Sequence, residues 1–415
     1  MIEGLDTELN PQEAGQARVV VVGGGVSGCA CAARLAAGGV QVTVVSSALD
    51  VVGLPGYDSE VWAGPGGLTE ITDTLDLLPD GLRWAWLNAA SFPESGEPVL
   101  LVDRRAVSIE SKRALEAIPG LGFRQGLVTD VRVRNRAREA GAPDPVTDAV
   151  AAARAGSGVQ TETGVEVETA FGEVFRADAV VLAPGLALRG RIEVGDEILP
   201  GGRYGEVPAD QLHSALEALG ITFEEATVDV APRYSGGAPL VEAAFESSHI
   251  GGENASTLVT RRLLPARALV PGPSSEDHVW PEGFPPAPHR TESLRPQDAV
   301  LSTSSEHAVV VTPDGSATAE YYVQLRNATL KPGKTGPDAL LGALDWSGGI
   351  TRLGHRVHAL VAVGIDPTGR VPEGMEQIRI VGRSAGAESY LGSLRSGVRA
   401  ADSLLRSLRR AGEPE

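Results

Sequence analysis

A glycine-rich segment near the N-terminus has the residue types and spacing of a dinucleotide-binding turn. Four consecutive valines, residues 19–22, run directly into the sequence GGGVSG, and an alanine-rich stretch follows. Gly23 permits a tight turn, Gly25 lets the backbone approach a diphosphate, and Gly28 lets a helix pack closely on the strand. The N-terminus of that helix attracts phosphate through N–H groups that have no partner within the helix. The segment therefore predicts a dinucleotide site.

A second glycine turn lies at the other end of the chain. An apolar run, residues 378–381, opens into Gly382-Arg383-Ser384-Ala385-Gly386, and a helical pattern follows. One glycine turn cannot distinguish NAD from FAD, but FAD-type folds close their site with a distant element whose helix N-terminus approaches the diphosphate. The alternative is that Gly382 and Gly386 only turn a strand into a helix.

The position that usually contacts the adenosine ribose departs from the common pattern. An acidic residue is expected about 20 residues after the glycine turn. This chain has Ser46 and Ser47 there, with Asp50 following later. A serine hydroxyl forms a weaker hydrogen bond than a carboxylate does. We therefore expect weaker ribose binding, or ribose contacts made by backbone groups.

The elements around these turns alternate between strands and helices, which predicts an α/β fold. The sequence indicates buried strands at 19–22, 40–45 and 179–182, and helices at 29–37, 68–78 and 208–219. We predict a Rossmann-like domain with an inserted mixed α+β substrate region. The expected divisions are a polar tail over residues 1–17, the Rossmann-like domain over 18–205 and 340–415, and the insertion over 206–339.

Composition narrows the partners and the compartment. The 415 residues carry 36 basic and 54 acidic side chains, a net charge of −18. This charge disfavours non-specific binding of polyanions, so we expect no DNA partner. No secretory signal and no apolar run of membrane-spanning length are recognisable, so we expect a cytoplasmic protein without a membrane partner. The oligomeric state stays open, with a homodimer among the alternatives.

Several blocks resemble the GidA/MnmG flavoproteins. The segment 175–190 ends in LAPGLALRG, and GGRYGE follows at 201–206. HAVVVTPDGSATAEYYV at 307–323 and GRSAGAESYLGSLRSG at 382–397 are similar to two further blocks of that family. The resemblance implies FAD, a Rossmann-type flavin domain with an insertion, and a link to wobble-uridine modification in tRNA. We expect a divergent, short form without the family's C-terminal tRNA-binding region.

The chain also differs from that family in its thiols. MnmG enzymes use cysteines in two segments, and the corresponding segments here, 51–67 and 272–278, have none. The two cysteines of this chain are Cys29 and Cys31, within the first helix. We interpret them as packing residues, although a helix N-terminus would lower the pKa of an exposed Cys29.

The leading hypothesis is an FAD-dependent oxidoreductase whose flavin is reduced by NADH or NADPH and whose acceptor is unknown. The alternatives are a divergent tRNA wobble-uridine (carboxymethylaminomethyl) modification enzyme and a non-catalytic FAD-binding protein. The substrate is correspondingly either a small molecule or tRNA.

The sequence predicts two sets of site residues and no metal site. The expected cofactor contacts are Gly23, Gly25, Val26, Ser27, Gly28, Ser46, Ser47, Ala183, Pro184, Gly185, Gly382, Arg383, Ser389, Tyr390 and Leu391. The candidate substrate contacts are Arg203, Arg233 and His307. The seven histidines are scattered and complete no metal-binding pattern. No catalytic residue is assigned.

Overall fold

The computed structural model describes most of the N-terminal half and the C-terminal part of the chain. The described residues are 17–54, 60–62, 67–93, 99–102, 104–135, 163–194, 197–203, 205–230, 233–235, 249–250, 256–265, 298–303, 307–313, 320–326, 349–352, 355–371, 375–387 and 389–412. The predicted tail, apart from residue 17, and much of the predicted insertion lie outside them. Among the described residues, no helix is long and apolar enough to cross a membrane.

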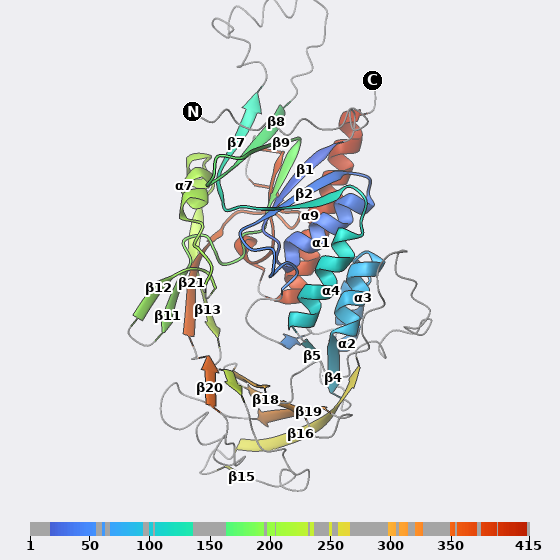
Figure 1. The fold of residues 1–415 in the computed structure, drawn as a ribbon, viewed down its shortest axis with the longest axis vertical. Helices are drawn as coiled ribbons and strands as arrows, with labels where there is room; N and C mark the ends of the chain where they lie inside the picture. Colours follow the sequence, from blue (N-terminus) through green and yellow to red (C-terminus); the bar gives the residue numbers. More distant parts are fainter. Residues whose placement is uncertain are drawn as a thin grey trace, which may run out of the picture.

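A five-stranded parallel sheet forms the centre of the molecule (Figure 1). Its strand order places β1 in the middle, with the strands from distant parts of the chain on one side. The strands, in order across the sheet, are β22 (Ile378–Ile380), β10 (Ala179–Leu182), β1 (Arg18–Val22), β2 (Gln41–Ser46) and β6 (Leu121–Gln125). This sheet confirms the predicted α/β class.

The valines of β1 explain why the sheet is covered on both faces. Val19 and Val21 pack with the helix side of the sheet, whereas Val20 and Val22 pack in a separate cluster on the opposite face. Side chains alternate between the two faces of a strand, so a run of valines buries both faces at once. The run of four valines therefore corresponds to a strand in the middle layer of three, covered on both faces.

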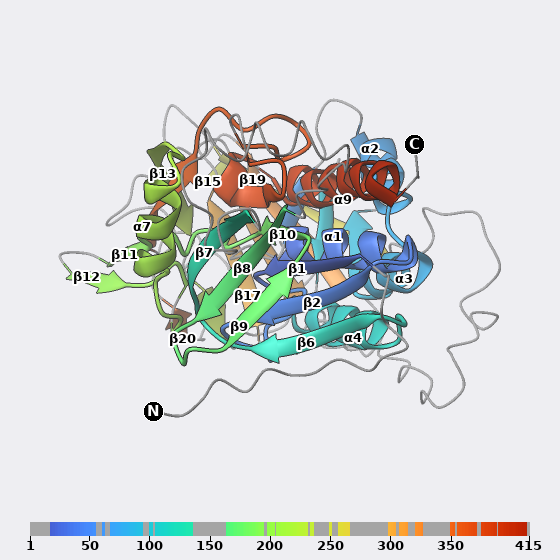
Figure 2. The ribbon, with the colours of Figure 1, turned by 90° about the horizontal axis from the view of Figure 1, so that it is seen from above.

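Helices cover one face of the parallel sheet, and α1 and α9 lie side by side there (Figures 1 and 2). Gly397 of α9 fits against α1, because a Cβ at this position would lie 2.2 Å from the carbonyl oxygen of Ser27. Close approach of two helices requires such small residues. The helices are α1 (Val26–Ala37), α2 (Gly67–Leu75), α3 (Asp80–Asn88), α4 (Arg104–Glu116) and α9 (Tyr390–Gly412).

A three-stranded antiparallel sheet covers the other face (Figure 2). It contains β7 (Val128–Asn135), β8 (Thr163–Thr169) and β9 (Val174–Ala177). Helix α7 (Asp210–Ala218) packs beside it, since Leu212 and Leu216 share the cluster of Val128 and Val131. Strands β8 and β9 pair antiparallel as a hairpin.

Two further sheets extend away from the parallel sheet (Figure 1). A four-stranded sheet contains, in order, β12 (Glu197–Pro200), β11 (Arg191–Val194), β21 (His355–Ala362) and β13 (Phe223–Val230). A ten-stranded sheet contains β20 (Gly349–Arg352), β14 (Arg233–Ser235), β17 (Asp298–Thr303), β18 (His307–Pro313), β19 (Glu320–Arg326), β16 (Ser256–Pro265), β4 (Ala90–Pro93), β5 (Val99–Val102) and β3 (Glu60–Trp62), with β15 (His249–Ile250) paired to β16.

The ten-stranded sheet combines strands from two distant parts of the sequence. Strand β16 pairs with β4, so strands from residues 60–102 continue a sheet built largely from residues 233–352. The sequence indicated a helix in the first of these regions but did not indicate β3, β4 or β5. The division of the chain into domains at residues 205 and 340 stays a prediction.

Candidate functional site

The first glycine turn connects β1 to α1 with very little space around its backbone. Gly23 has φ +101°, and a Cβ there would lie 2.2 Å from the carbonyl oxygen of Ala183. A Cβ at Gly28 would lie 2.0 Å from the carbonyl oxygen of Gly23. Both positions therefore need glycine for the close contact of strand, turn and helix.

Gly25 differs from its neighbours in this turn. It precedes α1 with extended backbone angles, φ −75° and ψ −174°, and a Cβ added to it would meet nothing within 4 Å. The open space beside Gly25 is a cavity that the neighbouring backbone also lines. A ligand can consequently approach the main chain here, as the sequence pattern predicts for a diphosphate.

The second glycine turn meets the first at Ser27. Gly382 opens the short 3₁₀ helix η4 (Gly382–Ala385) with φ +72°, and a Cβ there would lie 2.3 Å from Ser27 Oγ. The N–H of Gly382 donates to Ser396 Oγ at 3.1 Å, which ties this turn to α9. The two turns, more than 350 residues apart in the sequence, thus lie against each other.

Helix α9 begins with a cap formed by Ser389. The Ser389 hydroxyl accepts a hydrogen bond from the N–H of Gly392 at 3.0 Å, which satisfies one of the free donors of the first turn. Neither α1 nor α9 carries an acidic side chain in its first turn. The positive ends of both helix dipoles are therefore not neutralised locally by a carboxylate of the same turn.

A single cavity runs along the carboxyl ends of β1, β2 and β10 and contacts both turns. Its empty space, including solvent at the mouth, is about 1290 Å³. The predicted residues that line it are Gly23, Gly25, Val26, Ser27, Ser46, Ser47, Ala183, Pro184, Gly185, Arg203, Arg383 and Tyr390.

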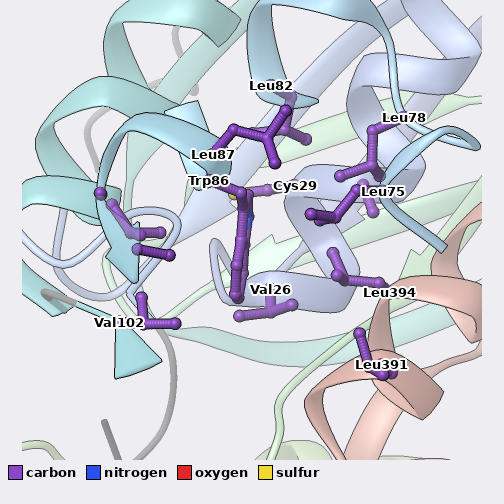
Figure 3. Packing of buried hydrophobic residues seen from close by; sticks show 14 of the residues in the cluster. Val26, Cys29, Leu75, Leu78, Leu82, Trp86, Leu87, Val102, Leu391 and Leu394 are labelled. Carbon is purple, nitrogen blue, oxygen red and sulfur yellow. The ribbon is translucent and has the colours of Figure 1, made fainter. Parts of the chain in front are cut away.

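Four of the predicted cofactor contacts lie outside the described lining of this cavity. Gly28 and Gly382 act in the backbone packing of the two turns, and Ser389 caps α9. Leu391 is 2% exposed and packs in a core between α1, α2 and α9 (Figure 3). The side chain of Leu391, the second residue of α9, lies on the face of the helix that is turned toward this core.

The two serines after β2 stand where the sequence places the ribose contact. Ser46 Oγ donates to the carbonyl oxygen of Ala48 at 3.0 Å, and Gln125 Nε2 donates to the carbonyl oxygen of Ser47 at 3.2 Å. The described lining contains no carboxylate at this end of the cavity. A ligand here would bind through hydroxyl and backbone groups.

The candidate substrate residues are separated in the structure. Arg203 lines the cavity, whereas Arg233 belongs to β14 and His307 to β18 of the ten-stranded sheet. The side chains of Arg233 and His307 lie outside the described part of the structure, so a substrate contact by either stays a prediction. The local pattern around each residue gave no information on which sheet would carry it.

The sequence missed one wall of the cavity. This wall is apolar apart from Glu206, and its members come from loops and from β7, α7 and β13: Val51, Leu54, Leu127, Val128, Leu186, Ala187, Gly202, Glu206, Val207, Ala209, Leu212 and Val228. The GGRYGE block at 201–206 was the available signal, because two of its members, Gly202 and Glu206, line the cavity beside Arg203.

Both cysteines are buried in the first helix, as the packing interpretation predicted. Cys29 donates from Sγ to the carbonyl oxygen of Gly24 at 3.2 Å, and burial raises the pKa of its thiol to about 12. Figure 3 shows Cys29 beside Trp86 in the core. Burial likewise raises the pKa of the Cys31 thiol. Neither thiol is a nucleophile at neutral pH in this state.

Comparison with known proteins assigns the fold and the family. The sequence model of the family "Glucose inhibited division protein A" matches residues 18–243, more than half of the chain. The chain belongs to this GidA family. The resemblance noted in the sequence blocks is thereby confirmed, and membership supports FAD as the cofactor and an FAD-dependent enzyme as the class of protein.

Two curated relatives are described as "tRNA uridine 5-carboxymethylaminomethyl modification enzyme MnmG". The protein of Caldicellulosiruptor saccharolyticus is 33% identical over 215 residues, which cover 50% of this chain and 30% of the relative. The protein of Chlamydia caviae is 24% identical over 329 residues, covering 74% and 49%. The chain therefore spans at most about half the length of these relatives.

A solved structure of Aquifex aeolicus GidA has the same fold. It superposes with a TM-score of 0.62 at 16% identity, over 96% of this chain and 64% of that one. At this identity the likeness concerns the fold alone. The Rossmann-like architecture predicted from the strand, turn and helix order is confirmed.

Proposed function

We propose that this protein is an FAD-dependent oxidoreductase of the GidA group, with NADH or NADPH as reductant. The observation that carries the proposal is the contact of the two glycine turns at Ser27, beside one cavity. The α1 turn and the η4–α9 turn both line that cavity. A single glycine turn fits many dinucleotides, whereas this paired arrangement fits the diphosphate bridge of FAD.

The residues present suit that cofactor by shape and by charge. The open space at Gly25 admits a diphosphate next to the backbone, and the first turn of α1 supplies N–H donors from Val26 and Ser27. Each helix N-terminus favours an anion by about 0.3–1 kcal/mol when exposed. Ser46 and Ser47 would contact the ribose, and Arg383 and Tyr390 would close the site from the η4–α9 side.

The chain's own residues position the cofactor and exclude water, and its thiols stay out of the reaction. When bound, FAD supplies hydride-transfer chemistry, which belongs to the cofactor rather than to the protein. Cys29 and Cys31 are buried with raised pKa values, so neither is suited to attack a substrate. We infer that electrons pass to the acceptor without a protein thiol.

Purification followed by a visible spectrum tests the proposal. We expect the absorption bands of oxidised flavin, and we expect heat to release FAD rather than FMN. Anaerobic NADH or NADPH should bleach these bands, and oxygen or another acceptor should restore them. A protein reconstituted with FAD that shows no flavin bands would contradict the proposal, and bands that neither nicotinamide bleaches would favour a non-catalytic flavin-binding protein.

Modification of wobble uridine in tRNA is the second candidate. The names of the curated relatives favour it, whereas the net charge of −18 and the two buried thiols do not support it. Binding of tRNA at low salt with a steep salt dependence is its prediction. Filter binding of labelled tRNA over a range of salt concentrations distinguishes the two candidates.

A further inference from the structure

A turn with close backbone contacts lines the cavity beyond β10. It comprises residues 201–203 and 205–206. Gly201 has φ +130° and donates its N–H to the carbonyl oxygen of Gly190 at 2.9 Å. A Cβ at Gly202 would lie 2.3 Å from the carbonyl oxygen of Leu186, and the N–H of Glu206 donates to the carbonyl oxygen of Arg203 at 3.1 Å. The described backbone of this turn is therefore tied to neighbouring segments by hydrogen bonds and close packing.

The turn presents an arginine and a glutamate to the cavity. Arg203 Nη1 lies 3.1 Å from Glu206 Oε1, and both side chains are 24% exposed. Arg203 Nη1 is shielded from solvent but has no hydrogen-bond acceptor of good geometry among the described residues. Glu206 is the one acidic side chain in the described lining. One carboxylate contact leaves much of the five-donor guanidinium group available.

The pair lies toward one end of the cavity. Ser46 and Ser47 follow β2, whereas the 201–206 turn packs against the segment after β10, on the other side of β1. A dinucleotide bound across the ends of these strands has its adenosine near the residues after β2. The end of the cavity that holds Arg203 and Glu206 would then face the reactive half of the cofactor.

We propose that Arg203 binds an anionic group, a carboxylate or phosphate, of the electron acceptor, and that Glu206 is a positioning residue that holds the guanidinium in place. This inference rests on the proposed function and narrows its unknown substrate to an anion. A planar guanidinium matches both oxyanions with paired hydrogen bonds. The net charge of −18 repels anions from the protein as a whole, so their binding needs a local cation of this kind.

Titration of the FAD-loaded protein with inorganic phosphate and with acetate, at constant ionic strength, tests the inference. Binding is read from the perturbation of the flavin bands and independently by equilibrium dialysis of labelled phosphate. Arg203→Gln should weaken binding at least about tenfold. Glu206→Gln should strengthen it, since the guanidinium loses its neutralising partner. Arg132→Gln is the matched control, because Arg132 is an exposed arginine of β7 paired with Asp130 and Glu168.

The two substitutions at the pair have effects of opposite sign only if Arg203 binds the anion. Unchanged binding in both variants would show that the pair only fixes the turn, and weaker binding in Glu206→Gln would show that the Glu206 carboxylate does not compete with the anion for the guanidinium; either result overturns the inference. Protein without flavin bands would instead overturn the proposed function, and dialysis would still compare the variants. If every variant binds FAD and all bind the anion with equal affinity, this inference is contradicted while the proposed function stands.

Discussion

The three-layer core and the four-stranded sheet are held together by different forces. In the core, glycines and valines bring backbones into contact, and Gly23, Gly28 and Gly397 each leave no space for a Cβ. In the sheet β12-β11-β21-β13, the apolar cluster is small: among the described residues its buried members are Ile192 and Val357. There His358 lies between two carboxylates, with Nε2 2.7 Å from Glu193 and Nδ1 3.0 Å from Glu225.

Because of this difference, changes in side-chain volume and changes in pH should affect the stability of different regions. A close-packed region responds to added or lost volume and hardly to pH, because few of its groups titrate. A thin sheet linked by charged pairs responds to pH, although each exposed pair contributes little. The predictions below test that contrast.

The largest effect is expected from emptying the core. Trp86 is among the largest fully buried side chains and contacts the cluster that includes Cys29 and Leu87 (Figure 3). Trp86→Ala should lower the free energy of unfolding by about 3–5 kcal/mol. Urea unfolding followed by circular dichroism measures this, and a loss below about 1 kcal/mol would contradict the close-packed description.

A smaller loss is expected from adding volume at the first turn. Gly28→Ala forces a Cβ to within 2.0 Å of the carbonyl oxygen of Gly23 unless the backbone shifts. We expect a decrease of about 1–3 kcal/mol in the free energy of unfolding. Gly122→Ala is the control, because a Cβ at Gly122 in β6 meets nothing within 4 Å. Equal stability of the two variants would show that the turn is not packed as described.

Gly25 separates ligand binding from packing within the same turn. Gly25→Ala places a methyl group in the cavity without contacting protein atoms within 4 Å. We expect unchanged unfolding, but about tenfold weaker FAD binding, equivalent to about 1.4 kcal/mol. Equilibrium titration of apoprotein with FAD, followed by flavin fluorescence, measures this. Unaltered affinity would place the diphosphate elsewhere in the cavity.

The smallest effect is a pH dependence in the four-stranded sheet. The hydrogen bond to Glu193 is the largest cause that raises the pKa of His358 above its ordinary value; burial, the next largest, lowers it, and the hydrogen bond to Glu225 raises it again. A raised pKa means that protonated His358 contributes its full stabilisation below about pH 6.5, the ordinary histidine pKa. That contribution is lost as pH rises through the pKa in the folded protein.

His358→Gln isolates this contribution. Unfolding at pH 5.5 and pH 8.5 should show a smaller difference between the two pH values in the variant than in the parent protein, while other titrating groups act equally on both. A variant with the same or a larger pH difference would show that the Glu193–His358–Glu225 arrangement does not stabilise the sheet.

Local sequence was most informative where neighbours in sequence are also neighbours in space. The predicted helix at 29–37 begins three residues earlier, at Val26, because the last residues of the glycine turn already have helical geometry. Leu391, Leu394, Val398 and Ala401, spaced three or four residues apart, are all buried in α9, in agreement with the helical pattern of this segment. Because Leu391 is buried in this core, it does not line the cavity, although its place just after the second glycine turn had suggested a cofactor contact.

The strand, turn and helix of each glycine motif could be predicted from the sequence alone. The φ preference of glycine and the spacing of apolar residues depend only on a few neighbouring residues. The sequence also shows serines rather than an acid directly after β2, and no cysteine in residues 51–67. The tertiary structure was needed to show that the two turns meet at Ser27, that the 201–206 turn lines the cavity, and that Arg233 and His307 belong to β14 and β18 of one sheet. Those placements depend on strand pairing and on close contact between segments hundreds of residues apart, which local propensity does not encode.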